Sequence, residues 1–329
     1  MHNSHHKFGF QMIGVLAVVF SMLVACQSAP MPDNIVTLTP SVTLGMTAIP
    51  STTMPLSPTS AVDAPQATST PPAAVRTLMS DLVDERVDIG VATLHIRCLG
   101  KGSPTVMLDS GPGDMWSIWQ RVMFDVAKFT RVCAYDRAGL GESLRGPKPR
   151  TSQQMANELA ALLDKGKIQG PYVLVSHATS NWIDRLYTAQ YPEQVAALVF
   201  VSPFHEDMIS GTLAILTPYP TDLARARQEI ANQGEGQSVD DWLTSADQVR
   251  AASNLGNLPL VLLAHSAFTS TEPYGAQIDA MLAKQEQQLL ALSTNSTRLV
   301  AEKSGHFIQR DQPQAVVDAI KLAIQMIKP

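Results

Sequence analysis

From Arg76 to the C-terminus, short apolar runs rich in β-branched residues alternate with longer stretches of helical pattern. The apolar runs are Thr105–Leu108, Thr130–Tyr135, Tyr172–Val175, Val195–Val201, Leu258–Leu263 and Thr297–Ala301. The helical stretches include Gln153–Leu163, with Ser152 as its candidate cap, and Gln312–Ile327. Nearly continuous apolar strands joined by helices are typical of a parallel sheet covered on both faces. Residues 76–329 are therefore predicted to form one doubly wound α/β domain.

The stretch Glu206–Asn257 interrupts this alternation, because it holds several helical patterns and no clear strand. We interpret it as a helical cap inserted over the sheet. The cleft beneath such a cap is the expected place for a bound small molecule.

The N-terminal segment has the organisation of a secretion signal. Lys7 precedes an apolar run from Met12 to Ala25, which is 14 residues long. A helix that spans a bilayer needs roughly 20 apolar residues, so the run fits the apolar region of a secretory signal better than a transmembrane helix. Residues 1–25 are therefore predicted to be a signal peptide.

The apolar run ends in Leu23-Val24-Ala25-Cys26, which resembles the lipobox of bacterial lipoproteins. The resemblance implies that the Cys26 thiol is acylated and that the protein lies outside the cytoplasm on a bacterial cell membrane. Several acyl chains, at about 0.8 kcal/mol per buried methylene, hold a protein durably on a bilayer. A plain cleaved signal with an incidental cysteine and an uncleaved anchor are the alternatives.

Residues 26–75 have the composition of a tether. Positions 27–75 contain 9 Pro and 15 Ser or Thr, and Asp33 and Asp63 are their only charged residues. Proline removes backbone donors, and no apolar periodicity offers a face to bury. The segment is therefore predicted to stay extended and solvated.

Composition excludes several classes of protein. The formal net charge of −5 disfavours a nucleic-acid binder, which is usually basic. Three cysteines are too few for a disulfide-dense miniprotein or a zinc-finger array. No residues have the spacing of a zinc site, and no glycine-rich phosphate loop follows a strand. We therefore expect no nucleic-acid partner, no metal and no cofactor, and the oligomeric state stays open.

Three spaced motifs together resemble the α/β-hydrolase family. They are Asp109-Ser110-Gly111-Pro112-Gly113, Asp136-Arg137-Ala138-Gly139-Leu140-Gly141-Glu142-Ser143, and Ser304-Gly305-His306-Phe307 followed by Asp311-Gln312-Pro313. The resemblance covers essentially all of residues 76–329. It implies an eight-stranded, mostly parallel sheet and a catalytic apparatus of nucleophile, acid and histidine in that chain order.

The nucleophile motif of that family, Gly-x-Ser-x-Gly, lies on a sharp turn between a strand and a helix. The corresponding segment here is Ser176-His177-Ala178-Thr179-Ser180. The alignment places Ala178 at the nucleophile position, and an alanine has no lone pair with which to attack. Ser176 and Ser180 replace both glycines, which predicts a strained turn that forms less readily.

The histidine position of the family is retained, whereas the acid position is not. His306 matches the histidine of the last loop and is the candidate base. Related hydrolases carry the acid after the sixth or seventh strand, where this chain has Ser202 and Ala264-His265. The nearest carboxylates, which would need a loop that folds back, are Glu206, Asp207 and Glu272.

The remaining parts of the apparatus are ambiguous. The backbone amides that face a developing oxyanion would come from Gly111 or Pro112 and from Thr179, and Pro112 has no amide hydrogen. Ser180 is a candidate substitute nucleophile, although two residues along a helix rotate a side chain by roughly 200°. Alternatively, Thr179 and Ser180 cap the following helix.

Two cysteines are left when Cys26 is set aside, namely Cys98 and Cys133. By the family's strand order the second and fourth strands are neighbours, and these cysteines lie on them. The resemblance therefore implies a cross-strand disulfide, with two buried thiols as the alternative.

The sequence thus predicts a membrane-tethered α/β-hydrolase-fold protein without serine-hydrolase activity. Loss of the nucleophile alone costs a serine hydrolase about 10⁶-fold in turnover. The cleft under the cap is expected to take a small, mostly apolar ligand. Two alternatives are an active hydrolase that uses Ser180 or water activated by His306, and lyase- or oxygenase-type chemistry that relies on His306.

Overall fold

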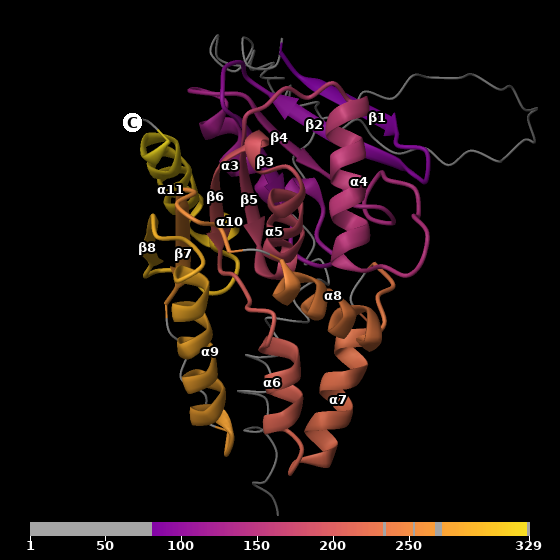
Figure 1. Ribbon diagram of the computed structural model, residues 1–329, viewed down its shortest axis with the longest axis vertical. Helices are drawn as coiled ribbons and strands as arrows, with labels where there is room; N and C mark the ends of the chain where they lie inside the picture. Colours follow the sequence, from indigo (N-terminus) through magenta and orange to yellow (C-terminus); the bar gives the residue numbers. More distant parts are fainter. Residues whose placement is uncertain (1–80, 233–234, 253, 267–271, 328–329) are drawn as a thin grey trace, which may run out of the picture.

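The computed structural model describes residues 81–327 apart from positions 233–234, 253 and 267–271. An eight-stranded sheet forms its centre, with the strand order β1-β2-β4-β3-β5-β6-β7-β8 (Figure 1). β2 pairs antiparallel with β1 and with β4, and the other pairings are parallel. The predicted doubly wound, mostly parallel α/β fold is confirmed. The predicted signal peptide, Cys26 and the predicted tether lie outside the described residues.

The strands follow the predicted runs closely. They are β1 (Val83–Asp88), β2 (Thr93–Leu99), β3 (Thr105–Asp109), β4 (Val132–Tyr135), β5 (Tyr172–His177), β6 (Val195–Val201), β7 (Leu260–His265) and β8 (Ser296–Ala301). No predicted run corresponds to β1 or β2. β1 is an edge strand whose side chains are mostly exposed and charged, and β2 was expected only from the strand order that the resemblance implies.

Helices cover both faces of the sheet. They are α3 (Gln120–Val126), α4 (Ser152–Lys165), α5 (Asn181–Gln190), α6 (Met208–Ile215), α7 (Pro220–Ala231), α8 (Val239–Ala251), α9 (Gly275–Leu290), α10 (Ile308–Asp311) and α11 (Pro313–Met326), with the 3₁₀ turns η1 (Trp116–Trp119), η2 (Ala178–Ser180) and η3 (Pro192–Gln194). In the part of the chain that is described, no helix has the length and hydropathy needed to cross a bilayer.

Successive side chains of β5 point to opposite faces of the sheet, so they pack into two separate core clusters. Val173 and Val175 pack with α3 and α11 on one face, whereas Tyr172 and Leu174 pack with α4 and α5 on the other. The residues of β5 are all buried, so this strand is the centre of the molecule and positions the turn that follows it.

The stretch predicted to be a cap consists mainly of helices, and a further helix packs against it. α6, α7 and α8 lie within the predicted range 206–257, and Figure 1 shows α6, α7 and α9 extending beyond one end of the sheet. α9 packs closely against α6, since a Cβ on Gly211 would lie only 2.4 Å from Met281 Sδ. Because α9 follows β7, its share in the cap was not predicted.

Several predicted boundaries were wrong by one or two residues. The N-cap residue of α4 is Thr151 and not the predicted Ser152. The Thr151 side chain accepts a hydrogen bond from the Gln154 N–H. Ser152 is the first residue of α4, and its N–H donates to Ser245 Oγ of α8 at 2.8 Å. β4 begins two residues after Thr130, and β7 begins two residues after Leu258.

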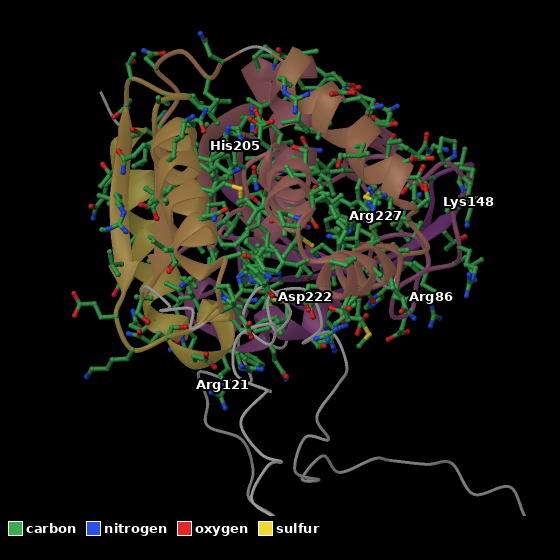
Figure 2. All side chains as sticks on the ribbon, turned by 90° about the horizontal axis from the view of Figure 1, so that it is seen from below. Arg86, Arg121, Lys148, His205, Asp222 and Arg227 are labelled. Atoms are coloured by element: carbon green, nitrogen blue, oxygen red, sulfur yellow. A yellow bond between two sulfur atoms is a disulfide. The ribbon has the colours of Figure 1, made fainter. Side chains whose placement is uncertain are left out.

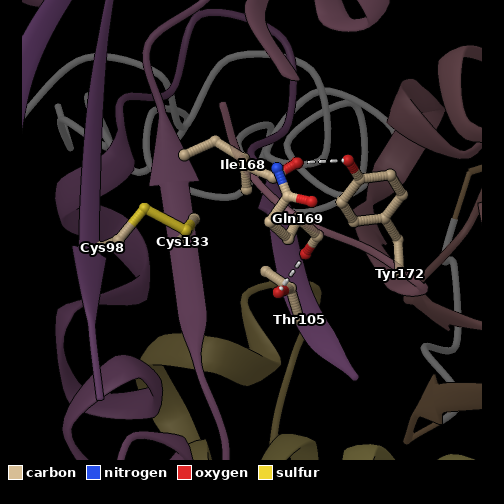
Figure 3. Close-up of a disulfide and its surroundings, with 6 residues drawn as sticks. All are labelled: Cys98, Thr105, Cys133, Ile168, Gln169 and Tyr172. Atoms are coloured by element: carbon tan, nitrogen blue, oxygen red, sulfur yellow. Dashed lines mark hydrogen bonds between the residues drawn. A yellow bond between two sulfur atoms is a disulfide. The ribbon is translucent and has the colours of Figure 1, made fainter. Parts of the chain in front are cut away.

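The predicted disulfide joins β2 to β4 (Figure 3). Cys98 and Cys133 are direct partners in the antiparallel register, with their Cα atoms 4.0 Å apart. A cross-link of this kind stabilises a folded chain by about 2–4 kcal/mol. Side chains also hold the loop before β5: Thr105 Oγ1 donates to the Gln169 carbonyl and Tyr172 OH to the Ile168 carbonyl, each at 2.6 Å.

Candidate active site

Ala178 stands at the apex of the turn between β5 and α5. Its φ is +58°, in the left-handed region that residues with a side chain rarely adopt. Asn181 Nδ2 donates to the Ala178 carbonyl at 2.7 Å, and the Phe204 N–H donates to the same oxygen at 3.3 Å. These bonds hold the sharp strand-to-helix bend that the family motif requires, with a methyl group at its apex.

The turn forms although Ser176 and Ser180 replace both glycines of the motif. Ser176 continues β5, where it is opposite Asp109 on one side and Phe200 on the other. Ser180 turns its hydroxyl onto the Ser110 carbonyl. Since neither residue has a positive φ, neither position requires glycine for backbone reasons.

His306 is in direct contact with Ser202. Ser202 follows β6 and has φ +47°, and its Oγ lies 2.7 Å from His306 Nδ1. The pKa of His306 is lowered well below its ordinary value, first by burial and then by the neighbouring His177 and His265. His306 is thus a neutral imidazole whose Nδ1 contacts a hydroxyl, where a serine hydrolase has a carboxylate.

Two of the candidate carboxylates are bound elsewhere. Glu206 forms a buried ion pair with Arg185, at 2.6 Å. Asp207 pairs with Arg250 of α8, also at 2.6 Å. Glu272 comes directly after positions 267–271, which lie outside the described residues.

Ser180 is engaged in a buried polar network. Its hydroxyl donates to the Ser110 carbonyl and accepts from Arg137 Nη1 at 3.2 Å. Its exposed fraction is 2%. The hydroxyl therefore lies on the side of the turn that faces Arg137, and it makes no side-chain capping bond to α5. Ser180 is thus the N-cap residue of α5 by position, as the alternative interpretation had it, but its side chain does not cap the helix.

Arg137 organises that network. It forms ion pairs with Asp109 at the end of β3 and with Glu235 in the connection between α7 and α8, and its Nη2 donates to the Gly111 carbonyl at 2.8 Å. Burial raises the pKa of Asp109 to about 6, although Arg137 opposes this shift. Arg137 thus ties the cap and the loop after β3 to the sheet.

His177 is a residue of the site that the sequence analysis missed. Its Nε2 lies 3.1 Å from the His306 carbonyl, and the centroids of the two imidazole rings are 4.5 Å apart. Burial lowers the pKa of His177 to about 4, so the ring is neutral at physiological pH. A histidine at the end of an apolar strand, next to Ala178, was the signal in the sequence that could have identified it.

The tautomer of His177 follows from this bond. A carbonyl oxygen only accepts hydrogen bonds, so the neutral ring carries its proton on Nε2 and leaves a lone pair on Nδ1. Nδ1 lies 3.8 Å from Asp114 Oδ2. Burial raises the pKa of Asp114 to about 7, against the opposing effects of Arg137 and Arg310.

A small cavity of about 20 Å³ lies beside Ala178. The cap supplies Met208, Ile209, Ile230 and Trp242 to its wall, and the sheet side supplies Phe204 and Phe307. Its polar residues are Asp114, Thr179 and the two neighbouring histidines. Figure 2, which views the molecule from the cap end, shows the charged side chains of Lys148 and Arg121 at the edge of the view.

The loop after β3 lines the same cavity through Gly111 and Pro112. A Cβ on Gly111 would lie 2.6 Å from His177 Nδ1, so glycine is required there by the close approach of the ring. Pro112 has no amide hydrogen to offer an oxyanion. Thr179, the other residue predicted for that role, is buried and lines the cavity. Within the described ranges, no group of three or more His, Cys, Asp or Glu side chains could hold a metal ion.

Sequence comparison identifies relatives of this arrangement. Residues 106–319 match the profile described as the alpha/beta hydrolase family. The uncharacterized protein YqjL of Bacillus subtilis (strain 168) is 27% identical over 226 residues, which cover 67% of this chain and 83% of that protein.

Solved structures share the fold at lower identity. A thermophilic esterase from Thermogutta terrifontis has a TM-score of 0.54 and 16% identity, and the match covers 75% of this chain and all 100% of the esterase. The haloalkane dehalogenase DatA from Agrobacterium tumefaciens C58 has a TM-score of 0.54 and 16% identity, with 74% and 97% of the two chains covered. Enzymes named for different reactions therefore share this architecture, and the similarity concerns the fold alone.

Proposed function

The chain belongs to the alpha/beta hydrolase family, and we propose that it is a membrane-tethered member that binds a small, mostly apolar molecule and lacks serine-hydrolase activity. The observation that carries the proposal is the methyl group of Ala178 at the apex of the β5–α5 turn. Acyl transfer by this fold needs a nucleophilic oxygen at that point, and alanine supplies none.

Two further contacts support the loss of activity. The partner of His306 Nδ1 is the Ser202 hydroxyl, which carries no negative charge to stabilise an imidazolium. The Ser180 hydroxyl, the candidate substitute nucleophile, bonds to Ser110 and Arg137. Loss of the nucleophile alone costs about 10⁶-fold in turnover, so damage to several parts leaves no dedicated esterase.

The cavity supports a binding role. Apolar side chains from three cap helices and from the sheet side enclose it, and few polar groups face it. Sites with an apolar wall and a small number of placed polar groups are typical of small-molecule binding. Its volume of about 20 Å³ has room for little more than a water-sized group, so any ligand held there is very small.

Hydrolysis of short acyl esters tests the loss of activity. The parent protein is expected to hydrolyse p-nitrophenyl acetate no faster than a non-enzymatic control protein of similar surface composition. Ser180→Ala is expected to leave this rate unchanged. Activity that disappears in Ser180→Ala would contradict the proposal in favour of a displaced nucleophile. Turnover that requires His306 but not Ser180 would favour chemistry without a serine.

Cavity filling tests the binding role. Ile209→Phe adds volume to the cavity wall and is expected to abolish the binding of small apolar molecules, as followed by ligand-observed NMR. Val300→Phe, at a side chain that is 40% exposed, is the matched control and should leave binding unchanged. Equal binding by both variants would show that the ligand lies elsewhere.

Membrane tethering is the remaining part of the proposal, and it rests on the lipobox at Cys26. When the full chain is expressed in a bacterium, Cys26→Ser is expected to move it from the membrane fraction to the soluble fraction and to prevent incorporation of labelled palmitate. Cys98→Ala removes a cysteine of the disulfide and should leave the lipid in place. Unchanged membrane association in Cys26→Ser would contradict lipid anchoring.

A further inference from the structure

A buried histidine lies between two carboxylates in a part of the sheet that does not line the cavity. His95 belongs to β2 and is only 2% exposed. Its Nδ1 is 2.9 Å from Oδ2 of Asp136, the residue that follows β4. Its Nε2 is 2.7 Å from Oδ1 of Asp84, which belongs to β1. Both distances are those of hydrogen bonds, so one ring joins three neighbouring segments of the sheet.

The two contacts determine the charge of the ring. An ionised carboxylate only accepts hydrogen bonds, so both ring nitrogens must donate. A neutral imidazole has one N–H group, whereas an imidazolium has two. The ring is therefore cationic while both bonds are made. The hydrogen bond to Asp136 raises the pKa of His95 against the opposing effect of burial, and the bond to Asp84 adds to the rise.

The charged groups around this ring come from each of the elements that pack against it. Arg97 of β2 pairs with Asp84 Oδ2 at 2.9 Å, and its guanidinium lies 4.4 Å from the centroid of the Trp116 ring. Glu142, in the turn after β4, pairs with Arg86 of β1. The three carboxylates are thus balanced by two guanidinium groups and the imidazolium. We call these six residues the His95 cluster: Asp84, Arg86, His95, Arg97, Asp136 and Glu142.

β1 depends on this cluster because it has few other contacts. It is an edge strand whose neighbour in the sheet is β2 (Figure 1), and most of its side chains are exposed. Val83 and Val87 are only partly buried against the core. The pairing of β2 with β4, by contrast, is reinforced by the disulfide between Cys98 and Cys133. A weaker cluster would therefore loosen β1 and leave β2 in place.

From this arrangement we propose that the His95 cluster holds β1 to the sheet in a pH-dependent way. The protonated ring secures the pairing of β1 with β2, and loss of its proton to the solvent leaves one carboxylate facing a lone pair and weakens that pairing. The pKa of His95 is raised above its ordinary value of 6.5 in the folded protein, so this stabilisation is fully present below pH 6.5 and is lost as the pH rises through the raised value. Because β1 is the first strand after the predicted tether, the cluster determines how firmly the domain holds the end of the chain that leads to Cys26.

The charge of the ring is measured by ¹⁵N NMR of the histidine side chains, in the full chain carrying Cys26→Ser. At pH 6.5, the ordinary midpoint of a histidine, His95 is expected to be mostly imidazolium. Asp84→Asn removes one carboxylate and is expected to lower the titration midpoint of the ring. Glu85→Gln, on the opposite face of β1, is the matched control and should leave the midpoint unchanged. A mostly neutral ring at pH 6.5 in the parent would overturn the proposal.

Release of β1 is measured by trypsin cleavage after Arg86, followed by mass spectrometry of the fragment that begins at Val87. Cleavage requires the strand to leave the sheet, so its rate reports the population of the released state. Below the midpoint found by NMR, His95→Gln is expected to be cleaved there at least about tenfold faster than the parent, because it has no charge to share with the two carboxylates. His205→Gln changes a histidine after β6 instead and should match the parent.

The parent itself should also change with pH. Its cleavage after Arg86, relative to a free peptide of the same local sequence, is expected to be faster above the midpoint than below it. A ratio that is the same on both sides of the midpoint would overturn the proposal, as would equal cleavage of the parent and a folded His95→Gln. If His95→Gln does not fold, the same comparison with Asp84→Asn, at a partly exposed side chain, takes its place.

Discussion

Ala178 has the backbone conformation expected of the family's nucleophile residue, but its side chain carries no nucleophilic group. Its left-handed φ of +58° is fixed by hydrogen bonds from Asn181 and Phe204 to its carbonyl oxygen. Those bonds involve no side-chain atom of residue 178, so the turn does not depend on the chemistry at its apex. A hydroxyl group introduced there should therefore occupy the nucleophile position of the family fold.

This consequence is tested by introducing the serine and the aspartate of the family's catalytic apparatus at positions 178 and 202. Ala178→Ser alone is expected to give little ester hydrolysis, because His306 Nδ1 still contacts the uncharged Ser202 hydroxyl. The double variant Ala178→Ser/Ser202→Asp is expected to exceed the single variant at least about tenfold in initial rate, since the carboxylate then orients the imidazole and stabilises its charge. Ala178→Val carries no hydroxyl and is the control. A double variant no more active than Ala178→Val would contradict the placement of these residues.

Asp114 makes stability depend on pH. Its pKa is about 7 in the folded protein against an ordinary value of 3.8, so the folded state holds the proton more tightly than the unfolded state. Its favourable contribution is fully present below about pH 4 and is lost as the pH rises through 7. Asparagine does not titrate, so Asp114→Asn does not lose stability in this way as the pH rises.

Urea denaturation checks the prediction at two pH values. Relative to the parent, Asp114→Asn is expected to raise the free energy of unfolding at pH 8 by at least about 1 kcal/mol, and by less at pH 5. A stability difference between the two proteins that is the same at both pH values would contradict the raised pKa.

Among the elements, a buried ion cluster around Arg137 ties the cap to the sheet. Arg137 follows β4 and binds Asp109 at the end of β3 and Glu235 between α7 and α8. The side chains of Arg137 and Glu235 are 3% and 1% exposed, so water does not screen their attraction. Removal of one partner would leave an uncompensated buried charge.

Glu235→Ala is therefore expected to lower the free energy of unfolding by about 3 kcal/mol. It should also speed proteolysis within the cap, because the connection between α7 and α8 loses its tie to Arg137. Glu286→Ala breaks a partly exposed pair with Arg298 and is expected to cost about 1 kcal/mol or less. Equal losses of stability in the two variants, measured by urea denaturation, would contradict the role of the cluster.

At the scale of the whole molecule, the central sheet could be predicted from the sequence because its strands are buried on both faces. Continuous apolar runs such as Val195–Val201 leave little doubt about a central strand. The edge strand β1 carries no such run, since its side chains face solvent. α9 was missed as part of the cap because its contact with α6 joins segments far apart in the chain.

The sequence predicted those parts of the site whose place in the fold depends only on the strand that they follow. Ala178 and His306 follow strands, and the carboxyl ends of parallel strands meet at one edge of a sheet. The role of His177 depends on the direction in which its ring points, which the sequence does not specify. The bond between Ser202 and His306 depends likewise on a backbone φ of +47° after β6.

The most direct test of the central claim is intact-mass spectrometry after treatment with a fluorophosphonate. This reagent reacts preferentially with an activated serine hydroxyl and forms a covalent adduct with it. The account predicts that the parent protein keeps its unmodified mass and that Ala178→Ser/Ser202→Asp gains one adduct on residue 178. An adduct on the parent, mapped to Ser180, Ser202 or any other serine, would contradict it.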